Sequence, residues 1–185
     1  MTQGFEADAN PSIKSSWDWH EFQVALLHEE RGRVLQMFQT NVTIIVERRR
    51  DAQFVGFSRF EVEDFFDIQL GHLKLLTMFD LLATTEAILR INFKDRVKAR
   101  KKDGLSKGFR KLQKAGGDKI RLDEDILPVM KEEGVRANVI ADFRSVLKLR
   151  HWLARGRHWN PKIGRGYEPG DVFDIAKALI DSMPL

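Results

Sequence analysis

Hydrophobic residues recur at every third or fourth position over most of the chain, which is the spacing of one helix face. Two long patterns of this kind cover residues 17–50 and 58–93, and two shorter ones cover residues 135–154 and the chain from 171 onward. Strand-like alternation and internal repeats are absent from the sequence. The pattern therefore predicts an all-α fold, an up-and-down bundle of four main helices with short additional helices.

Polar caps and glycines mark the ends of these predicted helices. Ser15 or Ser16 is expected to cap the first helix, near Trp17, and Asp171 is expected to open the last one. A turn at Gly56 precedes Ser58, which is placed to cap the second helix. Gly156 follows the third helix, where a glycine commonly ends a helix in the left-handed conformation.

The polar character of the chain divides it into an arm, a domain and an insertion. Residues 1–14 are polar and interrupted by proline, so we expect a flexible N-terminal arm. Residues 15–185 are expected to form a single helical domain. Within it, residues 94–118 are basic and rich in glycine, which indicates an inserted linker with one short helix.

Charge is distributed unevenly along the chain, although the net charge is only +4. Residues 90–114 contain 11 basic and 2 acidic side chains, and residues 144–165 contain seven basic ones and no acidic one. Two basic blocks favour a surface that faces a polyanion, while the alternative is two solvated helix faces.

The absence of cysteine excludes disulfides, thiolate zinc sites and a cysteine nucleophile. No apolar run approaches the roughly 20 residues of a membrane span, and the N-terminus does not resemble a secretory signal. We therefore expect a cytoplasmic protein without a membrane partner.

The densest basic stretch is LKLRHWLARGRHW, from Leu147 to Trp159. If it is helical, one ridge contains Arg150 and Arg157, and the adjacent ridge contains His151, Arg155 and His158. Cations near a helix C-terminus compensate its partial negative charge, which is the purely structural interpretation. Guanidinium groups without carboxylate neighbours also match phosphate in bidentate geometry, which is the functional one.

The chemistry of this stretch requires no metal. The sequence shows neither paired acids arranged for magnesium nor a histidine spacing typical of zinc, so no metal or cofactor is expected. In metal-free RNA cleavage the ribose 2′-hydroxyl attacks its own phosphate, assisted by a base, an acid and a cation. Histidine transfers protons near neutral pH, and arginine stabilises the developing charge.

The run LRHWLARGRHW in a late helix resembles the signature of HEPN domains, many of which are ribonucleases of toxin and antiviral-defence systems. The family motif is an arginine followed by a polar residue and then by a histidine, with four to six residues between the arginine and the histidine. Arg150 matches the arginine and His151 the polar residue, while Arg155 stands where the motif histidine is expected. In LLATTEAILR, Glu86 falls where related domains often have an acidic residue facing the site, although it is as well suited to pairing with an arginine between helices.

The resemblance implies an RNA-directed, metal-independent endoribonuclease with Arg150, His151, Arg155 and Glu86 in the site. Arg155 retains phosphate affinity but not proton transfer, so the protein is expected to be inactive or attenuated. Three explanations stay open: a weakly active or inactive natural form, a variant selected because the histidine form poisons its host, or an imidazole supplied by His151 or His158. Arg144 and His151 satisfy the motif spacing formally and offer an alternative pairing. The side chains expected to bind the nucleic acid are Lys148, Arg157, His158 and Arg144.

The resemblance also implies partners. HEPN-like sites are usually shared across a two-fold homodimer, and toxins of this kind are held by a cognate antitoxin protein. The alternative hypothesis is a non-catalytic dimeric helical module that binds RNA, a nucleotide or a partner protein. A DNA-binding regulator is the third interpretation, without a compact helix-turn-helix signal to support it.

Overall fold

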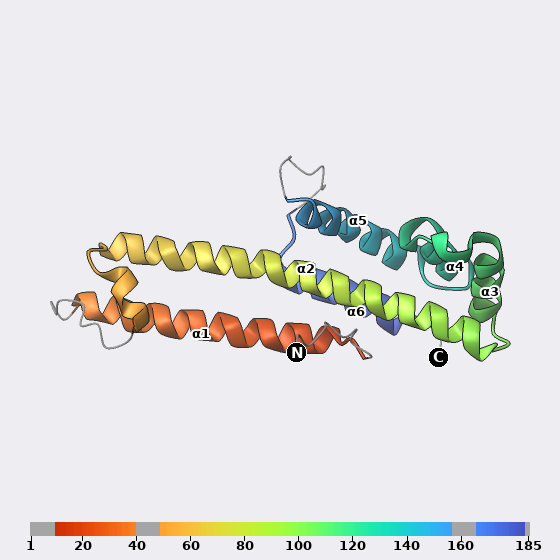
Figure 1. The fold of residues 1–185 in the computed structure, drawn as a ribbon, viewed down its shortest axis with the longest axis horizontal. Helices are drawn as coiled ribbons and strands as arrows, with labels where there is room; N and C mark the ends of the chain where they lie inside the picture. Colours follow the sequence, from red (N-terminus) through yellow and green to blue (C-terminus); the bar gives the residue numbers. More distant parts are fainter. Residues whose placement is uncertain (1–9, 40–48, 157–165, 184–185) are drawn as a thin grey trace, which may run out of the picture. The chain divides into compact units, whose positions relative to one another are not determined.

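The fold was analysed in a computed structural model, which describes residues 10–39, 49–156 and 166–183. These residues form α-helices and short helical turns without any strand, which confirms the predicted all-α class (Figure 1). None of the described helices is both long enough and apolar enough to cross a membrane. The helices in chain order are α1 (Ile13–Gln39), α2 (Arg59–Ala99), α3 (Gly104–Gly116), α4 (Leu127–Glu132), α5 (Ala137–Ala154) and α6 (Pro169–Asp181).

The chain packs as two compact units, which are described separately. One unit is Trp17–Thr77, and the other combines Met1–Ser16 with Met78–Leu185. The single domain and the bundle arrangement expected from the sequence stay predictions.

In the Trp17–Thr77 unit, α1 packs against the first half of α2 (Figure 1). Its core combines Val34 of α1, Val62 and Phe66 of α2, and Phe54 of the 3₁₀ turn Arg49–Phe54. The Phe54 ring stacks on Phe66, with ring centroids 5.8 Å apart. This buried cluster stabilises the end of the unit where the chain turns from one helix to the next.

The observed helix ends confirm one predicted cap and correct another. Ser58 caps α2: its hydroxyl accepts from Glu61 N at 3.3 Å, and its own backbone N–H donates to the Glu61 carboxylate at 2.7 Å. The predicted start of α1 near Trp17 is wrong, because Ser12 accepts from Ser15 N at 3.3 Å and the helix already begins at Ile13. The first serine of the segment acts as the cap, so Ser15 and Ser16 lie inside the helix.

A buried histidine joins the two helices of the Trp17–Thr77 unit. Thr77 Oγ1 donates to Leu73 O at 2.9 Å, so His20 Nδ1, 2.8 Å from the same hydroxyl, must be the donor in that contact. The neutral ring therefore has its proton on Nδ1. Burial lowers the pKa of His20 below its usual 6.5; nearby Glu21 opposes this shift and Lys74 adds to it.

We expect the free energy of unfolding to fall as the pH drops below about 6.5, because the unfolded chain then binds a proton that folded His20 resists. The stabilisation is complete above that pH and is lost progressively below it. Urea denaturation at pH 7.5 and pH 5 measures this difference. His20→Asn, whose amide replaces the Nδ1 donor, should reduce the pH dependence, whereas the control His72→Asn on the exposed face of α2 should not. Equal pH dependence in both variants would contradict the assignment.

The other unit is built on the second half of α2, together with α3 to α6. The side chains of Leu81, Leu82, Thr85 and Leu89 on α2 are fully buried in this unit. Residues of α5 and α6 complete the core, and the longest buried stripe is on α5: Ile140, Phe143, Val146, Leu147 and Leu149. The last helix, α6, begins at Pro169 rather than Asp171, because Glu168 and Asp171 form a reciprocal capping box around the start.

Most of the predicted basic linker is helical. Its first residues belong to the last turns of α2, and Gly104–Gly116 forms α3. Asp103 caps α3 by accepting from Ser106 N at 2.9 Å, and buried Arg96 of α2 donates to the same carboxylate at 3.0 Å. Hydrogen bonds from the Ser106 hydroxyl and backbone lower the pKa of Asp103.

The glycines that indicated a linker have a packing role instead. A Cβ at Gly108 would lie 2.6 Å from Val129 Cγ1 of α4, and one at Gly104 would overlap the Glu133 carboxylate. Glycine at both positions therefore allows α3 to approach α4 closely.

Candidate functional site

The predicted motif lies at the C-terminal end of α5. Arg150 and His151 belong to the last turn, and Arg155 is the C-cap residue, whose backbone N–H donates to His151 O at 3.2 Å. Gly156 then adopts φ +79°, the left-handed conformation that favours glycine, and confirms the predicted stop. The helix end thus fixes the spacing of the three motif side chains.

A cavity of about 510 Å³ opens beside this helix end, and all three motif residues line it. Glu86 and Arg90 of α2 form another part of its wall, and the segment from Ile120 to Glu124 closes it. Of the lining residues, eight are ionisable: Glu86, Arg90, Arg121, Asp123, Glu124, Arg150, His151 and Arg155. Four guanidinium groups around one polar cavity form a site suited to an anionic ligand.

Glu86 connects the two helices across the cavity. One carboxylate oxygen accepts from Arg90 Nε at 2.9 Å, and the other lies 3.1 Å from a terminal nitrogen of Arg150. Glu86 is 17% exposed and Arg150 29%, so this pair is mostly shielded from water. Glu86 therefore pairs with Arg90 on its own helix and with Arg150 of α5, and it also lines the cavity, while its role in a catalytic site stays a prediction.

Arg150 and His151 differ in how far they are exposed. The Nε of Arg150 is buried and has no hydrogen-bond partner among the described residues, which is unfavourable for a guanidinium N–H. The Arg150 side chain as a whole is 29% exposed, so another part of it can meet a ligand in the cavity. His151, by contrast, is exposed.

Two predicted nucleic-acid contacts, Arg144 and Lys148, lie on α5 before the cavity. Both are exposed, and both line an adjoining hollow of about 410 Å³ that His151 also borders. They line a further hollow of about 360 Å³ together with Lys131. Arg144 additionally donates to Asp123 O at 2.7 Å. The hollows therefore follow α5 from its C-terminal end toward its start, with cations beside each one.

The remaining predicted residues and two unpredicted arginines complete the description of the site. Arg157 and His158 lie outside the described residues, so their placement stays a prediction. Arg90 was not predicted, although its position four residues after Glu86 on a helix signals the pair. Arg121 was not predicted either, and no sequence spacing links it to α5. Among the described residues, no three His, Asp or Glu side chains converge as metal ligands.

No protein-family model matches the chain, and neither a curated protein nor a solved structure shows significant similarity to it. The resemblance to HEPN domains therefore depends on the residues of the α5 motif and on Glu86.

Proposed function

We propose that the protein is an RNA-directed, metal-independent endoribonuclease of the HEPN type whose cleavage step is attenuated by Arg155. The observation that supports this most is the convergence of Arg150, His151, Arg155 and Glu86 on one cavity of about 510 Å³. Glu86 lies on α2, more than 60 positions before the residues at the end of α5, and all four are site residues that the HEPN resemblance implies.

The site would act on a phosphodiester with a neighbouring 2′-hydroxyl. A base removes the hydroxyl proton, the oxygen bonds to phosphorus, the bond to the 5′-oxygen breaks, and an acid protonates that leaving oxygen. The products are a 2′,3′-cyclic phosphate and a 5′-hydroxyl end. Arg150 would bind the phosphate through its partly exposed guanidinium group and stabilise the crowded intermediate, and His151 would transfer one of the protons.

The second proton transfer is the weak point. Among the described residues, His151 is the only imidazole on the cavity wall. Arginine cannot serve as the second acid or base, because its guanidinium does not give up its proton in a protein. Placing a histidine at position 155 is the experiment that tests the function, because it supplies the second group that can transfer a proton.

Glu86 provides a second test of the cavity. Glu86→Gln preserves the size of the side chain and removes one negative charge, so RNA binding should tighten about 2- to 5-fold. Fluorescence anisotropy with a labelled oligoribonucleotide measures this change. The matched control is Glu63→Gln, because Glu63 also accepts from an arginine on its own helix, Arg59, at 3.1 Å. Binding that weakens in the Glu86 variant would show that the carboxylate is needed to hold Arg150 in place.

The proposal includes a two-fold homodimer in which two copies of the α5 motif face one cleft. Such an arrangement doubles the number of guanidinium groups around the phosphate and supplies a second copy of His151. A cognate antitoxin protein belongs to the same proposal. The particle mass measured by light scattering decides whether the chain of 21.4 kDa is paired.

The second candidate is a non-catalytic module that binds RNA through the same cavity. The single imidazole and the four arginines favour binding over proton transfer. This candidate predicts salt-sensitive RNA binding without cleavage, both for the chain as given and for the variant with histidine at position 155.

A further inference from the structure

The surface of α3 carries a concentration of cations that the candidate site does not use. From Lys98 to Lys119, eight basic side chains are exposed, and none of them makes an ion pair among the described residues. The eight are Lys98, Arg100, Lys101, Lys102, Lys107, Lys111, Lys114 and Lys119. We call this group the α3 basic surface. Asp103, in the same stretch, is already engaged by Ser106 and Arg96.

The packing of α3 leaves its three lysines exposed. Leu105 and Phe109 are buried, and the Phe109 ring contacts Phe93 of α2 with centroids 5.0 Å apart. Gly104 and Gly108 face α4, as described above. Lys107, Lys111 and Lys114, spaced by four and three residues, occupy the remaining side of the helix.

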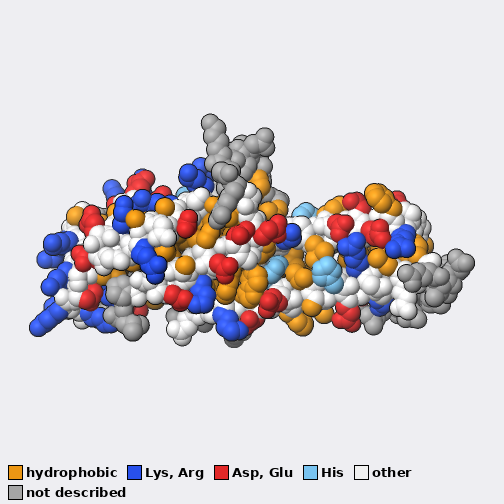
Figure 2. All heavy atoms as spheres, turned by 180° about the vertical axis from the view of Figure 1, so that it is seen from behind, with side chains coloured by type: hydrophobic (Ala, Val, Ile, Leu, Met, Phe, Trp, Pro, Cys, Tyr) orange, Lys and Arg blue, Asp and Glu red, His pale blue; other side chains and the backbone are white. Residues whose placement is uncertain are grey.

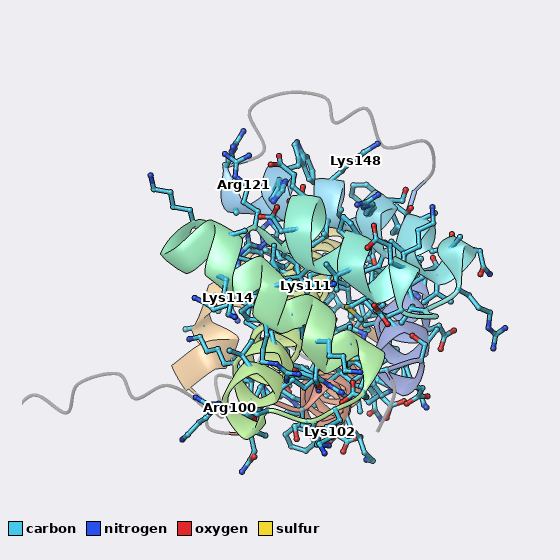
Figure 3. All side chains as sticks on the ribbon, turned by 90° about the vertical axis from the view of Figure 1, so that its right-hand side faces the viewer. Arg100, Lys102, Lys111, Lys114, Arg121 and Lys148 are labelled. Carbon is cyan, nitrogen blue, oxygen red and sulfur yellow. The ribbon has the colours of Figure 1, made fainter. Side chains whose placement is uncertain are left out.

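The figures show how far this charge extends. Figure 2, in which the α3 end lies at the left, shows lysine and arginine side chains gathered there. In Figure 3 the labelled cations follow one another from Arg100 and Lys102, past Lys111 and Lys114, to Arg121. Arg121 also lines the cavity at the end of α5. The charge therefore continues from the α3 basic surface to the edge of the candidate site.

We propose that the α3 basic surface is a binding site for the sugar-phosphate backbone of RNA. It holds the strand outside the cavity and directs it past Arg121 toward Arg150. The binding of the RNA backbone is inferred from the charge and exposure of these side chains. The path of the strand toward Arg150 depends on the proposed function. Lys107 and Lys114 are separated by about 10 Å along the helix, so they can contact different phosphates of one strand.

The chemistry of the surface favours a backbone ligand over base recognition or a lipid. Lysine is a compact point charge that contacts phosphate without reading sequence. A helix that binds a membrane inserts an apolar face into it, but the apolar face of α3 is already buried in the core. The ion pair of Arg121 with Glu124, at 2.6 Å, is exposed, so it contributes little and can be exchanged for a phosphate.

The test neutralises three lysines of α3 together, as Lys107→Gln, Lys111→Gln and Lys114→Gln. Anisotropy with a labelled oligouridine of about 25 nucleotides measures binding between about 50 and 200 mM KCl. Because the variant loses three phosphate contacts to a single strand, the negative slope of log K against log salt should become shallower by about 2. Affinity at the lower salt should drop about 10- to 100-fold.

The matched control carries the same loss of charge elsewhere, as Lys14→Gln, Lys74→Gln and Lys177→Gln, all at exposed positions. Its affinity and salt slope should stay within about twofold of the unchanged protein, and circular dichroism verifies folding of both variants. Equal binding by the α3 variant and the control overturns the proposal. Retention on phosphatidylserine vesicles without RNA binding overturns it as well.

A cleavage assay separates this proposal from the proposed function. In a protein with histidine at position 155, the α3 variant should cleave the long RNA more slowly, while a dinucleotide, which is too short to bind the cavity and α3 together, is cleaved at an unchanged rate. If no variant cleaves RNA and the α3 variant still loses binding, the proposed function fails and the α3 basic surface stands. If both RNAs are cleaved as before and binding is unchanged, the α3 surface fails and the function stands.

Discussion

Arg155→His should give the protein a metal-independent RNase activity at least about 100-fold above that of the chain as given. The change supplies a second imidazole on the cavity wall, one helical turn beyond His151, and general acid–base catalysis contributes about 10²- to 10⁴-fold. Cleavage of a labelled RNA in the presence of EDTA, with detection of 2′,3′-cyclic phosphate ends, measures the gain. Expression of the same variant should slow the growth of its host.

Two control variants distinguish a restored imidazole from a removed arginine. Arg155→Gln removes the same positive charge without supplying a group that titrates, so it should not gain activity. Arg150→Ala added to the histidine variant should abolish the gain, because phosphate loses its guanidinium partner. Equal activity of the histidine and glutamine variants would reject the proposed role of position 155.

Asp51→Ala should lower the free energy of unfolding by about 3 kcal/mol, the lower end of the range for breaking a buried ion pair. The Asp51 side chain is only 1% exposed and accepts from Arg33 of α1, which also donates to Glu30 at 2.7 Å. Hydrogen bonds to Glu30 and Asp51 raise the pKa of Arg33, so its charge persists after the partner is removed. Guanidinium denaturation followed by circular dichroism measures the loss.

The matched control for this prediction is Asp67→Ala. Asp67 also pairs with an arginine of α1, Arg31, at 2.8 Å, but its side chain is 62% exposed. An exposed pair contributes about 0–1 kcal/mol, so this variant should be nearly as stable as the unchanged protein. If Asp51→Ala and Asp67→Ala lowered the free energy of unfolding by the same amount, the role of burial would be contradicted.

The helices could be predicted from the sequence because the information that sets them is local. Periodic apolar positions identified α1, α2, α5 and α6, and the capping serine and glycine at Ser58 and Gly156 were also recognised. The predicted start of α1 was wrong because three serines within five residues are possible caps, and the hydrogen bond from Ser15 N to the Ser12 hydroxyl identifies the first of them. The helix α3 was interpreted as a linker because of its glycines. Two of them are needed for contact with α4, which depends on tertiary packing and not on the local sequence.

The candidate site was predictable only where its residues share one helix. The motif in α5 selected Arg150, His151 and Arg155, and the resemblance added Glu86. Arg121 reaches the same cavity from the segment between α3 and α4, and no periodicity in the sequence connects it to α5. The part of the site that depends on long-range packing therefore required the structure.

Because Gly156 follows it, position 155 can be substituted at little cost in folding stability. The glycine adopts the left-handed turn, so the residue before it ends the helix without strain of its own and is exposed. Exchanges at such a surface position usually change folding stability by less than about 0.5 kcal/mol. Under the proposed function, a change of one codon at position 155 would therefore switch the cleavage step on or off without endangering the scaffold that presents the site.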